Sequence, residues 1–85
     1  MPIIASFYGI TIRMYFRQSE HNPPHVHALY GGSTAEIAIQ DGEVLDGQLP
    51  PKALSMVKQW VAKNRDDLMK IWSTQEFKRL EPLEM

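Results

Sequence analysis

The chain contains no cysteine, which excludes disulfide bonds, thiolate metal sites and cysteine nucleophiles. It also lacks a surplus of either charge, since nine basic residues stand against ten acidic ones. Proteins that bind nucleic acids usually carry a clear basic surplus, so any phosphate-binding site here must be local. The apolar N-terminal stretch has neither a basic start nor a run long enough for a signal peptide or a membrane span. We therefore expect a cytoplasmic protein that is not inserted in a membrane.

The length of 85 residues predicts one domain close to the lower size limit for an unassisted hydrophobic core. The hydrophobic fraction of 44% is typical of a folded globular chain. No repeat, linker or low-complexity segment divides the sequence. We expect a single domain over residues 1–85, with a β part at about 3–47, a helical part at about 50–77 and a short tail at 78–85.

Four strands are expected in the first half of the chain. Apolar and polar side chains alternate with period two over residues 10–17, which predicts a first strand at about residues 6–17. Asn22-Pro23-Pro24 then forms a stiff bend, and Gly31-Gly32 and Asp41-Gly42 are two-residue turn signals. The remaining strands are therefore expected at residues 25–30, 33–40 and 43–46.

The second half of the chain has a helical pattern. Leu49-Pro50-Pro51 opens it, because proline is tolerated in the first turn of a helix. Asn64 to Asp67 interrupts the apolar spacing, which indicates a helix break with a new N-cap. Trp60 and Trp72 suit core positions. The predicted fold is α+β: an antiparallel meander of three to four strands followed by one or two C-terminal helices packed on one sheet face.

Side-chain alternation then predicts what lies on the other sheet face. If the helices cover the side of Ile12 and Met14, the polar members of each strand gather on the opposite side. Those residues are Arg13, Tyr15, Arg17, His25, His27 and Glu36. This set is either a reactive surface or the solvated side of a half-buried sheet.

All three histidines fall within "EHNPPHVHALY", residues 20–30. His25 and His27 lie on one side of a strand, about 6.6 Å apart along it, a spacing that suits two ligands of one metal. His21 is the candidate third ligand, and Glu20 or Glu36 would complete a set suited to zinc or a similar divalent ion.

Two other interpretations of the histidines need no metal. In the first, His25 and His27 are a general acid–base pair oriented by His21, and the protein is a metal-independent ribonuclease. Arg13 and Arg17 would then bind phosphate, and Tyr15 or Tyr30 would stack a base or hold a phosphate. In the second, the histidines only cap a rigid loop.

Several blocks of the sequence resemble a bacterial family called domain of unknown function 4160. They are "FYGITIRMYF", "EHNPPHVHALYGG", "AEIAI" and "DGEVLDGQLPPKAL", followed by Trp60, Asn64, Leu68 and Trp72. The positions that match the family's motif are Glu20, His21, Pro23, Pro24, His25, His27 and Tyr30, with Met14 and Tyr15 upstream.

The resemblance implies the toxin-like component of a two-gene toxin–antitoxin-like module, with a small antitoxin-like protein as partner. RNA as a candidate target follows from the histidines and arginines of the predicted sheet face. The alternative is a non-catalytic module that binds a divalent metal or a protein through the histidine-rich loop. Exposed sheet edges make a homodimer a further candidate assembly.

Overall fold

The computed structural model describes residues 2–15 and 23–84. Five antiparallel strands form one sheet in which each strand pairs with the next along the chain. The strands are β1 (Ile3–Phe7), β2 (Ile10–Arg13), β3 (His25–Tyr30), β4 (Ser33–Ala38) and β5 (Val44–Gly47). Two helices follow, so the predicted α+β meander is confirmed, with five strands instead of three or four.

The first hairpin corrects the predicted single strand over residues 6–17. Tyr8 and Gly9 form a two-residue turn between β1 and β2, with φ angles of 47° and 81°. Positive φ at both positions matches the twist of a tight hairpin. A tyrosine in this conformation is uncommon, so the sequence gives no turn signal before Gly9.

The other turn signals are confirmed. Gly31-Gly32 joins β3 to β4, and the Asp41-Gly42 turn precedes β5. Gly47 ends β5 at a φ of 75°, and a Cβ at this position would collide with the carbonyl oxygen of Thr34. Only glycine therefore lets β5 lie this close to β4.

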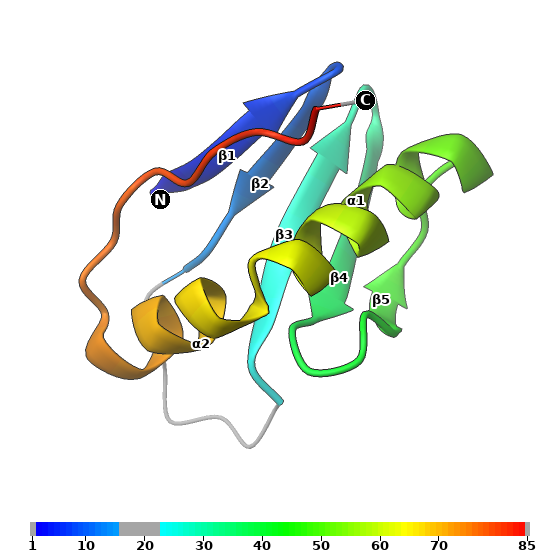
Figure 1. Ribbon diagram of the computed structural model, residues 1–85. Helices are drawn as coiled ribbons and strands as arrows, with labels where there is room; N and C mark the ends of the chain where they lie inside the picture. The colour runs from blue at the N-terminus through cyan, green and yellow to red at the C-terminus, as the bar shows by residue number, and fades with distance from the viewer. Residues whose placement is uncertain (1, 16–22, 85) are drawn as a thin grey trace.

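Two helices separated by a break cover one face of the sheet (Figure 1): α1 (Pro51–Lys63) and α2 (Arg65–Thr74). Asn64 stands at the junction, as predicted. Its side-chain amide donates to the carbonyl oxygen of Trp60 at 2.9 Å, so the side chain caps the end of α1 and makes no cap bond to α2. Its backbone carbonyl accepts from the Leu68 amide in the first turn of α2. Arg65 fixes the start of α2 to the sheet, because its Nε donates to the carbonyl oxygen of Ile39.

The hydrophobic core lies between the helices and this sheet face. Ile10, Ile12 and Met14 are fully buried, as the alternation predicts. Trp60 is also fully buried beside Phe7, with ring centroids 5.8 Å apart. Its role as a core residue is therefore confirmed.

The C-terminal segment after α2 runs beside β1 (Figure 1). The amide of Leu80 donates to the carbonyl oxygen of Ile4, and the indole Nε1 of Trp60 donates to the carbonyl oxygen of Glu81 at 2.8 Å. Leu83 is buried, so this segment is part of the packed structure. No helix in the described part of the chain is long and apolar enough to cross a membrane.

Candidate metal centre

Three polar side chains form a row across neighbouring strands. Arg13 on β2 pairs with His27 on β3, and His27 pairs with Glu36 on β4. Directly paired residues in an antiparallel sheet point to the same face. Val26, Ala28 and Ile37, which alternate with them, are buried on the helix side. The row therefore lies on the sheet face opposite the core, where the alternation places it.

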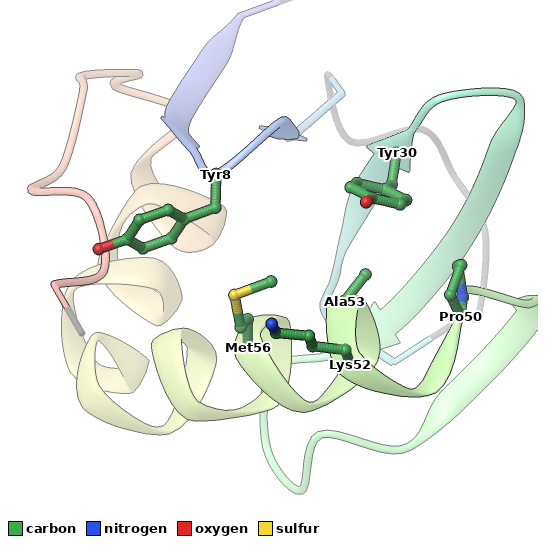
Figure 2. Close-up of a pocket in the computed structure, with 6 residues that line it drawn as sticks. All are labelled: Tyr8, Tyr30, Pro50, Lys52, Ala53 and Met56. Carbon is green, nitrogen blue, oxygen red and sulfur yellow. The ribbon is translucent and has the colours of Figure 1, made fainter.

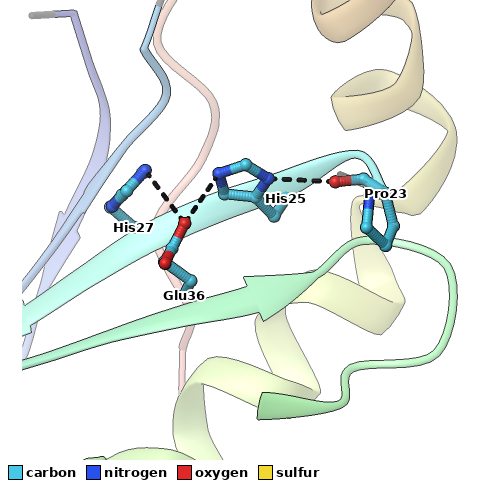
Figure 3. A network of polar contacts seen from close by, with 4 residues as sticks. All are labelled: Pro23, His25, His27 and Glu36. Carbon is cyan, nitrogen blue, oxygen red and sulfur yellow. Dashed lines mark hydrogen bonds and ion pairs between the residues drawn. The ribbon is translucent and has the colours of Figure 1, made fainter. Parts of the chain in front are cut away.

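Both histidines of β3 converge on one oxygen of Glu36 (Figure 3). His25 Nε2 lies 3.0 Å and His27 Nε2 lies 3.8 Å from Glu36 Oε1. One nitrogen from each histidine and one carboxylate oxygen all lie within 4.8 Å of one another. The side chains of His25, His27 and Glu36 are only 11%, 20% and 26% exposed. This group is thus a partly desolvated cluster and not a freely solvated surface.

The hydrogen bond of His25 to the proline bend defines the protons on its ring. Its Nδ1 lies 2.9 Å from the carbonyl oxygen of Pro23, which can only accept a hydrogen bond (Figure 3). Nδ1 must therefore carry the proton, and in a neutral ring Nε2 then has a lone pair directed at the Glu36 carboxylate. Two lone pairs at 3.0 Å are compatible only if a proton or a cation lies between them. The Nδ1 contact also matches the way in which metal-ligating histidines are held by backbone carbonyls.

Two aromatic rings flank the histidines. The ring of Tyr15 lies edge-on to His27 with centroids 4.1 Å apart, and Trp72 from α2 lies 5.3 Å from His25. Trp72 is half-buried and packs against the core as well. The sequence predicted only the core role. Its position next to Ile71, at the margin of the apolar stripe, is the signal that marks it as a boundary residue.

Burial lowers the pKa of His27 below its ordinary value of 6.5, and the neighbouring His25 adds to this effect while Glu36 opposes it. At pH values between the lowered pKa of the folded chain and the ordinary pKa of the unfolded chain, the unfolded chain binds more protons at this histidine. The contribution of neutral His27 to the free energy of unfolding is therefore complete above about pH 6.5 and is lost as the pH falls. We expect urea unfolding of the metal-free protein to show stability falling below about pH 6.5. His27→Gln should remove that component. Equal pH slopes for both proteins would contradict the prediction.

Four other residues were predicted for the site. Arg17, Glu20 and His21 lie outside the described residues. Tyr30 alternates with the histidines on β3 and lies with the core side of the sheet. The structure therefore brings together His25, His27 and Glu36, with Arg13 and Tyr15 beside them, and separates Tyr30 from them.

A hollow of about 420 Å³ is present near the start of α1 (Figure 2). Tyr8 and Tyr30 line it from the sheet, and Pro50, Lys52, Ala53 and Met56 line it from the helix side. It contains one charged group and none of the histidines. The residues that line the hollow do not form a recognisable metal or acid–base site. The cluster on the opposite sheet face is therefore the better candidate site.

The fold and the cluster define a class: a small α+β protein whose sheet face carries two histidines and one carboxylate with their ligand-type atoms within 4.8 Å of one another. Comparison with protein families matches residues 9–73 to the family described as a domain of unknown function (DUF4160), and the chain belongs to this family. No curated protein and no solved structure matches the chain significantly.

Proposed function

We propose that this protein binds a divalent metal ion through His25, His27 and Glu36. The observation that carries the proposal is the convergence of two imidazole nitrogens on one carboxylate oxygen, at 3.0 and 3.8 Å. Ligand atoms on one tetrahedral zinc ion lie about 3.3–3.6 Å apart, given bonds of about 2.0–2.2 Å. The two nitrogen-to-oxygen separations bracket this range and all three ligand atoms lie within 4.8 Å of one another, so side-chain movements bring them onto one ion.

The ligand types favour particular metals. Two imidazoles and a carboxylate suit zinc, nickel, manganese or ferrous iron. Counted over the described residues, 2–15 and 23–84, three protein ligands leave at least one coordination position open, which is typical of metal sites that bind a water molecule or a substrate. Sites that are purely structural usually have four protein ligands. The proposed centre is therefore of the open, ligand-accepting type.

The hydrogen bonding of His25 favours this function over metal-independent acid–base catalysis. Its Nδ1 bonds to Pro23 and its Nε2 faces Glu36, so neither ring nitrogen is directed at a substrate. A general acid or base must reach the proton that it transfers. Metal binding uses both contacts as they stand, with Nδ1 holding the ring and Nε2 as the ligand. The toxin-like role and the antitoxin-like partner rest on the family resemblance, and RNA as a target rests on the predicted histidine and arginine face. All three stay predictions.

Equilibrium dialysis with Zn²⁺, Ni²⁺ and Mn²⁺ tests the proposal. We expect one ion to bind per wild-type chain, and we expect no such binding by a His25→Ala/His27→Ala variant whose fold is checked by circular dichroism. The proposal fails if none of the three ions binds the wild-type protein more tightly than the millimolar range.

A further inference from the structure

Arg13 is the charged residue that the proposed metal centre does not use. It lies directly across the β2–β3 pair from His27, on the same sheet face. Its Nε is buried and has no hydrogen-bond partner among the residues that the structure describes. A buried donor without an acceptor is unfavourable, and native structures rarely leave one unpaired. Because Arg13 pairs with His27, a group bound at the cluster would supply such an acceptor.

The charges of the site indicate the sign of that acceptor. A divalent ion bound by one carboxylate and two neutral imidazoles gives the centre a charge of about +1, and Arg13 adds a second positive charge next to it. Asp46, which pairs with Glu36 on β5, is exposed and screened by solvent. Two neighbouring cations repel each other unless an anion lies between them.

We propose that the open position of the metal centre takes a phosphate group, held between the metal ion and the Arg13 guanidinium. The inference rests on the metal centre proposed above. A guanidinium binds oxyanions through two parallel hydrogen bonds to two oxygens, and the metal takes a third oxygen. A phosphate supplies three oxygens, whereas a carboxylate supplies only two. The substrate class is therefore a phosphate or phosphate ester.

The test uses the full chain loaded with Co²⁺, whose visible absorption reports changes in coordination. Inorganic phosphate, acetate and adenosine 5′-monophosphate are titrated into the wild type, Arg13→Gln and a matched control, Arg79→Gln, which removes an exposed arginine from the C-terminal segment. We expect phosphate to bind the Arg13→Gln protein about 10- to 100-fold more weakly. The affinity of this variant for Co²⁺ alone should be unchanged or higher, because a neighbouring cation has been removed.

The arms of the experiment separate the two proposals. If wild type does not bind Co²⁺, the metal centre and the phosphate site fall together. If Co²⁺ binds but phosphate leaves the spectrum unchanged, or binds Arg13→Gln as tightly as wild type, only the phosphate site falls. Acetate binding as tight as phosphate binding would also overturn it. Tighter binding of the nucleotide than of phosphate would support the site and identify nucleotides as the source, with Tyr15 and Trp72 as neighbouring rings. Equal affinities for the nucleotide and for inorganic phosphate would support the site and would mean that only the phosphate group is recognised.

Discussion

Glu36→Gln is expected to weaken Zn²⁺ binding by about 100-fold or more, since even groups that only support a metal ligand contribute about 10- to 100-fold. The substitution keeps the shape of the side chain but removes the charge that both histidines face. An ion that binds only the folded state stabilises it by about 2.7 kcal/mol at a free concentration of 100 times Kd. For a domain of this size, that corresponds to a rise in Tm of roughly 10–20 °C. Thermal unfolding with and without zinc measures the shift, and competition with a chromophoric chelator measures the affinity.

Glu43→Gln is the matched control for this experiment. Glu43 is an exposed carboxylate in the connection between β4 and β5 and does not belong to the cluster. We expect this variant to show the full zinc-induced rise in Tm, whereas Glu36→Gln shows almost none. A zinc shift of wild-type size in Glu36→Gln would rule out Glu36 as a ligand.

Trp60→Ala is expected to destabilise the protein by about 3–5 kcal/mol, the usual cost of truncating a large buried aromatic side chain. The indole is fully buried against Phe7 and also donates to the carbonyl oxygen of Glu81. Because small domains are stable by only about 5–15 kcal/mol in total, this variant should be close to unfolding. Urea unfolding followed by circular dichroism measures the loss.

Trp60→Phe separates the two contributions of the indole. It keeps an aromatic ring in the core but removes the hydrogen bond to the C-terminal segment. We expect a smaller loss of stability, together with faster amide hydrogen exchange at Leu80, whose amide donates to Ile4. A Trp60→Ala protein as stable as wild type would mean that the helices do not depend on this residue for packing.

The local signals in the sequence determine most of the sheet. Gly31-Gly32 and Asp41-Gly42 mark two hairpins, and period-two alternation identifies the buried face, because both features act within a few residues of the chain. The sequence did not predict the first hairpin, because Tyr8 adopts a positive φ although tyrosine is not a residue type that favours this conformation. The alternation that predicts the first strand begins at Ile10. Phe7 and Ile10 are both buried although they lie three positions apart, so the period-two pattern breaks at the turn.

The sequence also predicts which residues of the candidate site share a sheet face. The His-x-His spacing places His25 and His27 together, and strand parity adds Glu36 and Arg13 to their face. The hydrogen bond from His25 to Pro23 and the packing of Trp72 on His25 depend on the path of a bend and the placement of a helix. Such long-range geometry leaves no periodic trace in the sequence.

The alternation within β3 has a consequence for how this protein tolerates change. Val26 and Ala28 are completely buried, while His25 and His27 point to the other side of the same strand. Substitutions at the histidine positions therefore remove no atoms from the buried side of the strand, and the contact of His25 with Trp72 is what links this face to the core. The ligand set on this face is consequently free to diverge while the scaffold is retained, and it offers a surface on which a different metal preference can be installed.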